Sequence, residues 1–389
     1  MPWGCAAPRG DGVPKDEAAA VEWFRKAITK GHVDAQRRLG MCYLLGSGVP
    51  QDAAEAVKWL RLAAAQNHVA AMKQLGVCYS LGSGVTKDMA EGLKWYRQAA
   101  ERGDADSQLE LGTAYFDGEG VEQNAAEAVK WFRKAADQGD LNAQKLLGTT
   151  YAEGTRLPQD LREAAKWFRK AAEKDDPEAQ MHLGLACLVG AGVPLDVKQG
   201  IDLLRRSAAQ EYAPAQFELC ECYMLGSGVE KDPAEAVAWY RKAADQGEAI
   251  AQTKLAVSYF EGTGVAQNVV DAAEWFRKAA EQNFPLAQVG LGGCLLGGKG
   301  VTKDEAQAMK WFRAAADRGN ADGQFALCLM YEKGEGVEKH LVEALKWCRL
   351  ASKQGHDIAE LHQATLEASL TREQIIEAVR LEREWKPAK

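Results

Sequence analysis

A chain of 389 residues would ordinarily form two or three domains, and a composition of 47% hydrophobic and 26% charged residues is that of a folded protein. No run approaches the ~18–20 apolar residues of a membrane span, so we expect no membrane insertion. The net charge of −7 and the pI of 5.6 argue against a nucleic-acid partner, because proteins that bind nucleic acid normally carry a basic stripe.

The first thirteen residues, MPWGCAAPRGDGV, lack the charged-then-apolar pattern of a secretory signal, so we expect a cytoplasmic protein. They already follow a repeat, because Gly4, Gly10, Gly12 and Val13 recur 36 residues later. We therefore expect an incomplete first repeat at the start of the chain.

Tryptophan marks this repeat along the rest of the chain. It recurs at multiples of 36 residues, and Leu203 alone breaks the series Trp23, Trp59, Trp95, Trp131, Trp167, Trp239, Trp275, Trp311 and Trp347. Ten copies without insertions predict a solenoid, in which each repeat packs only against its neighbours. Each buried Trp would remove roughly 150–250 Å² from water and so hold neighbouring repeats together.

Two helical patterns flank a glycine turn within each repeat, as residues 111–139 illustrate. The first helix is expected to end at Gly118 and Gly120, where the backbone needs positive φ. Asn124 with Glu127 predicts a capping box at the start of the second helix, and Gly139 predicts its left-handed end. The expected buried residues are Leu111, Gly112, Tyr115, Ala128, Trp131, Phe132, Ala135 and Ala136.

An arginine fills one column in all ten copies, from Arg25 to Arg349. One interpretation is a ladder that binds anions. We favour a structural role, in which each guanidinium bonds carbonyls or carboxylates of the neighbouring helix while its stem covers apolar surface.

The nine cysteines mostly occur one per repeat, where other copies carry Ala, Ser or Gly. This distribution favours buried free thiols in a reducing compartment. A disulfide is compatible only with pairs such as Cys328 and Cys348, which lie on the two helices of one repeat.

Two places break the repeat. The copy between Cys187 and Leu204 lacks its Tyr and its Trp, and Arg156 replaces a turn glycine just before it, so a hinge is expected there. Further on, the missing side chains of Gly290 and Gly293 would open a notch in a first helix, beside Phe260 and Phe325. Neutral drift is the alternative explanation for both.

The end of the chain, residues 370–389, reads as a polar closing helix and tail. Thr371 with Gln374 predicts a capping box, and the helix would present Ile375 and Val379 to the last repeat, with Ile376 as a further candidate. A solenoid needs such a terminal cap, so we place the solenoid domain at 1–369.

Enzyme motifs are scarce. Residues 293–299, GCLLGGK, come near a phosphate loop, but Gly300 stands where a Ser or Thr should bind Mg²⁺. The chain contains no S-x-x-K and no H-E-x-x-H motif, and its six histidines are scattered. We therefore expect no catalytic, cofactor-binding or metal-binding residues.

The repeat pattern L-G-x-x-Y-x-x-G-x-G-V-x-x-D-x-x-x-A-x-x-W-x-R-x-A-A-x-x-G resembles the Sel-one-like repeat (SLR) family, which is related to the tetratricopeptide repeats. The match covers about residues 4–368. The resemblance implies an adaptor that assembles protein complexes, with the first helix of each repeat lining a concave surface.

The outward positions of these first helices form one stripe at helical spacing i, i+4, i+7 and i+8. Its large apolar residues and few carboxylates suit an extended peptide or a partner helix, although packing between repeats is the alternative. The candidate partner-binding residues are Arg37, Met41, Met181, Leu185, Phe217, Glu221, Met224, Val257, Phe260 and Phe325.

The sequence thus predicts an all-α, right-handed α/α superhelix of ten 36-residue helix-turn-helix repeats with a C-terminal capping helix. We expect a non-enzymatic scaffold whose partner is a protein or peptide. The alternatives are a hydrolase or other small-molecule enzyme with a pocket near Gly293, and a purely structural spacer.

Overall fold

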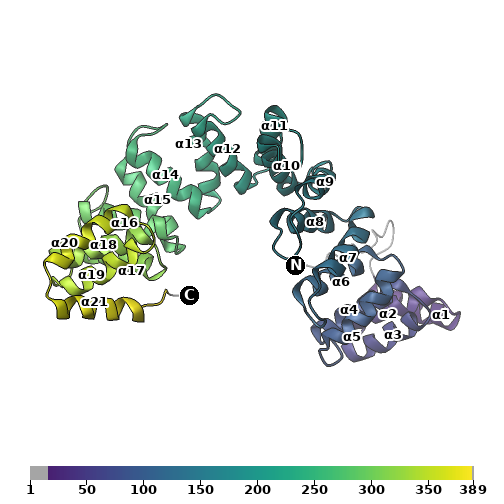
Figure 1. Ribbon diagram of the computed structural model, residues 1–389. Helices are drawn as coiled ribbons and strands as arrows, with labels where there is room; N and C mark the ends of the chain where they lie inside the picture. Colours follow the sequence, from purple (N-terminus) through teal and green to yellow (C-terminus); the bar gives the residue numbers. More distant parts are fainter. Residues whose placement is uncertain (1–15, 388–389) are drawn as a thin grey trace. The chain divides into compact units, whose positions relative to one another are not determined.

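The structure, a computed structural model, describes residues 16–387, which form 21 α-helices and no strand (Figure 1). The glycine register predicted for residues 4–13 lies outside the described residues. None of the helices is long and apolar enough to cross a membrane.

Two kinds of helix alternate along the chain. The first helices of the repeats, called A helices here, are α2 (Val33–Leu45), α4 (Val69–Leu81), α6 (Ala105–Asp117), α8 (Leu141–Glu153), α10 (Pro177–Val189), α12 (Ala213–Leu225), α14 (Ala249–Glu261), α16 (Pro285–Gly297), α18 (Ala321–Lys333) and α20 (Asp357–Ala368). The second helices, called B helices, are α1 (Glu17–Thr29), α3 (Ala53–Ala65), α5 (Met89–Glu101), α7 (Ala125–Asp137), α9 (Leu161–Ala172), α11 (Val197–Ala209), α13 (Pro233–Asp245), α15 (Val269–Glu281), α17 (Glu305–Asp317) and α19 (Leu341–Ser352). The last helix is α21 (Arg372–Glu384).

The chain divides into two compact units. The first contains residues 1–174 and 191–193, and the second contains residues 175–190 and 194–389. The segment of the predicted hinge carries buried Leu203 and Leu204, and α11 packs on α10 within the second unit. The hinge itself stays a prediction, as does the domain boundary at residue 369.

The glycine turn between an A helix and a B helix has the predicted left-handed geometry. In the hairpin of α4 and α5, Gly82 (φ +78°) ends the A helix and its N–H donates to the Cys78 carbonyl. Gly84 (φ +73°) lies against the preceding B helix, where a Cβ would sit 2.0 Å from the Ala53 carbonyl oxygen. This turn therefore needs glycine both for its φ angles and for its packing.

The predicted capping of the B helices is half correct. Asn124 Oδ1 accepts the N–H of Glu127 at 3.0 Å, as expected for an N-cap. The Glu127 side chain does not reach back to close a capping box, because it binds Lys130 Nζ at 2.8 Å instead. At the other end of this helix, Gly139 adopts the predicted positive φ of 93°.

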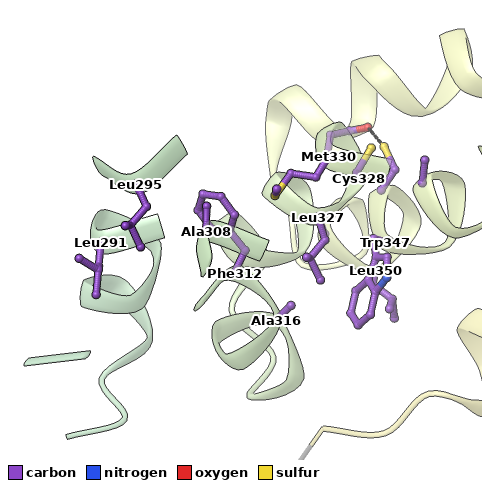
Figure 2. Close-up of a cluster of buried hydrophobic side chains, with 14 of the residues drawn as sticks. Leu291, Leu295, Ala308, Phe312, Ala316, Leu327, Cys328, Met330, Trp347 and Leu350 are labelled. Atoms are coloured by element: carbon purple, nitrogen blue, oxygen red, sulfur yellow. Dashed lines mark hydrogen bonds between the residues drawn. The ribbon is translucent and has the colours of Figure 1, made fainter. Parts of the chain in front are cut away.

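The predicted core columns are buried, except that Tyr115 and five of the tryptophans are only half-buried. A Cβ on Gly112 would lie 2.5 Å from the ring of Phe132, so this glycine lets an aromatic ring of α7 lie flat on α6. One cluster in the second unit joins residues from every helix between α14 and α21. Figure 2 shows its members Leu291, Leu295, Ala308, Phe312, Ala316, Leu327, Cys328, Met330, Trp347 and Leu350.

The tryptophans join successive repeats as predicted. Trp167 is 1% exposed and packs with Leu147 of its own repeat and with Phe132 of the preceding repeat. Trp347 is fully buried. Trp23 is 67% exposed, since α1 is the first helix described and no described B helix precedes it.

A buried ladder of glutamines, which the sequence analysis missed, also joins the repeats. Gln108 on α6 donates to the Ala100 carbonyl at 2.9 Å, and its Oε1 accepts from Gln138 of the next B helix at 2.8 Å. The same glutamine pair, 30 residues apart, recurs at Gln66–Gln36, Gln210–Gln180, Gln246–Gln216, Gln282–Gln252 and Gln354–Gln324.

This ladder is interrupted in three places, at one of which Met72 replaces the first glutamine. The other two places keep the first glutamine. The Oε1 atoms of Gln144 and Gln288 are buried without a hydrogen-bond partner. Thirty residues further on, Lys174 and Arg318 stand where the other repeats carry the second glutamine. Their side chains bond the preceding turn instead, at the Gly139 carbonyl and at Asn283 Oδ1 respectively.

The last helix packs against α19 but not through the whole predicted face. Its capping box is present, with Thr371 and Gln374 exchanging hydrogen bonds of 2.9 and 3.3 Å. Ile375 packs against the core, but Ile376 is 61% exposed, so the expectation for Ile376 is wrong. The buried face centres on Ala378 and on a carboxylate, described next.

Glu382 of α21 is buried at 4% exposure and carries a negative charge into the helix interface. It binds Arg349 Nε at 2.6 Å and Lys353, both on or next to α19. Polar anchoring therefore replaces part of the apolar contact that the sequence predicted. Trp385 completes the contact, with its ring 6.1 Å from that of Trp347.

Candidate partner-binding surface

The stripe predicted on the A helices lies where neighbouring A helices meet. Within the second unit, α10 contacts α12 and α16 contacts α18 directly. The outermost column of the stripe is the last residue of each A helix. In several repeats this residue is apolar and strongly exposed. These are Leu45 (55% exposed), Leu81 (66%), Val189 (75%) and Leu225 (71%).

An apolar groove of about 240 Å³ lies on the stripe of the first unit, between α2 and α4. Met41, one of the predicted binding residues, lines it together with Leu44 and Leu45 of α2. Val77 and Leu81 of α4 form the other wall. The groove contains no charged side chain, and its polar lining consists of an amide, a hydroxyl and a buried thiol.

A second hollow of about 440 Å³ lies on the stripe of the second unit, between α14 and α16, and is called the glycine pocket here. The notch predicted at Gly290 and Gly293 beside Phe260 is therefore present. Phe325, which was expected beside it, does not line it. The lining residues are Phe260, Phe276, Val289, Gly290, Gly293, Cys294, Leu296, Gly297 and Lys299.

The two central glycines of this pocket act differently. A Cβ on Gly290 would lie 2.5 Å from the ring of Phe276, so Gly290 is required for that ring to lie against α16. A Cβ on Gly293 would meet nothing within 4 Å, so its missing side chain leaves open space. Each glycine inside a helix costs roughly 0.5–1 kcal/mol relative to alanine.

Several predicted binding residues are already engaged within the protein. Glu221 accepts a hydrogen bond from Tyr240, and its Oε1 lies 3.5 Å from Lys254 Nζ. Phe217 packs against the same tyrosine, with ring centroids 6.0 Å apart. Arg37 is paired with a carboxylate of its own helix at 2.9 Å.

Met181 is the clearest departure from the predicted stripe. It is 8% exposed and belongs to a core cluster with Ile201 and Leu204 of the following B helix. The alternative weighed for this stripe was packing between repeats. The same cluster also contains Leu219 of the next repeat, so packing accounts for Met181. Its neighbour on the stripe, Leu185, is half-buried against the same cluster.

The remaining predicted residues are partly accessible. Val257 is 36% exposed, Met224 is half-buried beside the α12–α13 core, and Phe260 lines the glycine pocket. Phe325 is half-buried between two histidines of the following repeat. Its ring lies 4.7 Å from that of His356 and 5.9 Å from that of His362.

The arginine that recurs in all ten repeats has a structural partner in most of them. Arg133 donates to the Tyr151 hydroxyl of the next A helix at 3.0 Å, and five further pairs repeat this contact. These are Arg25–Tyr43, Arg61–Tyr79, Arg97–Tyr115, Arg205–Tyr223 and Arg313–Tyr331. The structural role is therefore supported. Tyrosine hydroxyls are the common partners, and the expected carboxylates are bound by Arg133, at Glu163, and by Arg349, at Glu382.

A third hollow, of about 860 Å³, lies between α11 and the loop before α13 in the repeat that lacks its tryptophan. It has no counterpart in the predictions. Cations and anions line it in equal number, namely Lys198, Arg205 and Lys231 against Asp202, Glu230 and Asp232. Because these charges balance, the hollow favours neither sign of ligand.

The glycine pocket offers little for catalysis. Its one nucleophile is the Cys294 thiol, and burial raises the pKa of that thiol, which makes it a poor nucleophile. No histidine or carboxylate lines the pocket. Between residues 16 and 387, no three His, Cys, Asp or Glu side chains gather as a metal site, and none of the eight cysteines there, including Cys328 and Cys348, forms a disulfide.

Comparison with known proteins places these features in a family. The family model of the Sel1 repeat matches ten segments, at residues 9–32, 33–68, 69–104, 105–140, 141–176, 177–212, 213–248, 249–284, 285–320 and 321–356. No curated protein matches the chain.

Two solved structures are similar over most of the chain. One is a protective antigen of uropathogenic Escherichia coli strains that displays an SLR fold, with 36% identity over 97% of this chain and 88% of that chain and a TM-score of 0.62. The other is a Sel1 repeat protein from Oxalobacter formigenes, with 33% identity over 81% of this chain and 94% of that chain and a TM-score of 0.68. These matches confirm the predicted all-α solenoid, and the chain is a member of the Sel1 repeat family.

Proposed function

We propose that this protein is a non-enzymatic scaffold that binds a partner polypeptide, as an extended peptide or a helix, along the stripe of its A helices. Sel1 repeat proteins are generally protein-interaction scaffolds, and their solenoid is typically non-catalytic. The proposal adds to this the surface on which the partner binds.

One observation carries the proposal. Apolar hollows open at the same repeat positions in both units, between α2 and α4 and between α14 and α16. Adjacent exposed residues such as Leu45 and Leu81 are large and apolar, which costs solvation free energy unless a partner covers them. A purely structural spacer would carry a polar stripe instead.

The test replaces two aromatic stripe residues of the second unit. A partner is first isolated by pull-down from the native host and identified by mass spectrometry. We expect Phe217→Ala with Phe260→Ala to weaken its binding at least tenfold, because each ring removes roughly 1.5–3 kcal/mol of apolar contact. Circular dichroism should show unchanged helicity.

A matched control removes two exposed apolar residues from B helices, outside the stripe. Leu62→Ala with Val270→Ala removes side chains that are 50% and 52% exposed. This pair should leave the affinity within about twofold of the native value. Equal affinities for the native chain and the Phe217/Phe260 variant would refute binding along the stripe.

A further inference from the structure

The glycine pocket differs from the groove between α2 and α4 in its charge. Lys299, in the turn after α16, is the one charged residue that lines it. Its Nζ lies 5.0 Å from the centroid of the Phe260 ring, at the edge of an otherwise apolar hollow. Helix α16, PLAQVGLGGCLLG, contains no charged residue at all.

The charge of Lys299 is not neutralised within the described part of the chain, where no carboxylate lies within ion-pair distance of it. Lys303 in the same turn behaves differently, because it pairs with Glu305 at 2.8 Å. An uncompensated cation beside an apolar hollow favours a partner that supplies both an apolar group and an anion.

The shape of the pocket defines the apolar group. The rings of Phe260 and Phe276 and the bare backbone at Gly293 surround about 440 Å³, enough for one large aliphatic or aromatic side chain. Aromatic and aliphatic anchors in such hollows usually dominate the binding energy of an interface.

We propose that the glycine pocket anchors a large apolar side chain of the partner polypeptide, and that Lys299 pairs with an aspartate or glutamate next to that anchor. This inference rests on the proposed function, because it assumes that a polypeptide binds the stripe. The groove between α2 and α4 has no charged lining residue, so it would not select an acidic neighbour.

The probe is a library of random dodecapeptides displayed on phage inside a disulfide-closed loop, so that no free C-terminus is present. Peptides selected on the full chain are synthesised with blocked ends, and their affinities are measured by fluorescence anisotropy. We expect a shared motif of one large apolar residue with Asp or Glu within one or two positions.

Two variants of the chain test the two parts of the motif. Gly293→Leu fills the open space and adds a better helix former, so the variant should fold and lose at least tenfold in affinity. The control Ala126→Leu adds the same side chain at an exposed position of the B helix α7, outside the stripe, and should change nothing. Lys299→Glu should lower the affinity for acidic peptides at least fivefold. Changing the acidic residue of the peptide to lysine should restore its binding to this variant.

The control for charge is Lys87→Glu, an exposed position in the first unit, which should leave the affinity unchanged. The inference would be overturned, and the proposed function would stand, if the selected peptides bind less tightly to the Phe217/Phe260 double variant but with unchanged affinity to both Gly293→Leu and Lys299→Glu. A selection that enriches no peptide, or only peptides indifferent to the double phenylalanine variant, would overturn both.

Discussion

The break in the glutamine ladder at Gln288 gives a stability prediction whose size follows from the structure. Gln288 is 1% exposed, and its Oε1 has no hydrogen-bond partner. An unsatisfied buried acceptor costs about 1–3 kcal/mol. In the preceding repeat, Gln282 satisfies the equivalent oxygen of Gln252 at 2.9 Å. Arg318→Gln should therefore complete the ladder at Gln288.

The substitution also removes two surface hydrogen bonds, which a second site controls for. Arg318 donates to the Ala314 carbonyl at 3.0 Å and to Asn283 Oδ1 at 2.6 Å. Arg102 makes the same two kinds of bond, to the Gln98 carbonyl and to Asn67 Oδ1. Its repeat carries Met72 where a ladder glutamine would stand, so Arg102→Gln loses the surface bonds and gains no buried one.

Each substitution changes the local free energy of unfolding relative to the native chain. We expect this change to be about 1 kcal/mol more stabilising for Arg318→Gln than for Arg102→Gln. Solenoids often unfold in parts, so the assay is native-state hydrogen exchange of the amides in α16 and α17, and of those in α4 and α5 for the control. A gain of about 1 kcal/mol slows exchange roughly fivefold. Equal protection changes at the two sites would refute the ladder as a source of stability.

Three further predictions concern the cap, the turn and the pocket. Burial raises the pKa of Glu382, but hydrogen bonds from two basic side chains outweigh it and lower the pKa below its usual value. The docking of α21 should thus be complete above the unfolded pKa of about 4.3 and should weaken as the pH falls below it. Trp385 fluorescence should follow this loss in the native chain. In Glu382→Gln it should not change over the same pH range. Gly84→Ala should destabilise its hairpin in urea by clearly more than Gly103→Ala, because both positions have positive φ but only Gly84 faces backbone within 4 Å. Phe260→Ala alone should leave the urea midpoint nearly unchanged while weakening the binding of peptides to the stripe. A clear fall in the urea midpoint would instead assign the ring to packing within the fold.

The sequence predicts the features that depend on local rules and recur in every copy. The turn at Gly82 and Gly84, the N-cap at Asn124 and the packing of Phe132 on Gly112 each follow from residue chemistry at short range. Repetition strengthens these predictions, because one rule applies again every 36 residues. The notch at Gly293 follows for the same reason, since a missing side chain in a known helix leaves a gap.

The features that the sequence hides depend on which polar groups meet across repeats. Glutamine is ordinarily an exposed residue, so polarity alone does not indicate that Gln108 is buried and bonded at both ends. A signal is present in the spacing, because glutamines recur in pairs 30 residues apart. The burial of Met181 is hidden in a similar way, since its column is half-buried in most repeats and buried only at Met181 and Thr253.

Constraint and variation fall on different parts of each repeat, and this separation explains how one fold can present a specific surface. The turn glycines and core alanines are fixed by contacts that any larger residue would break. A side chain at Gly293 would contact nothing within 4 Å, and residues as different as Met41, Val77, Thr113 and Glu221 stand at the equivalent positions. A change at Gly293 therefore alters the surface without disturbing the stacking. Specificity in this protein can then arise by removing a side chain as readily as by adding one, because the neighbouring helices hold α16 in place around the space that is left.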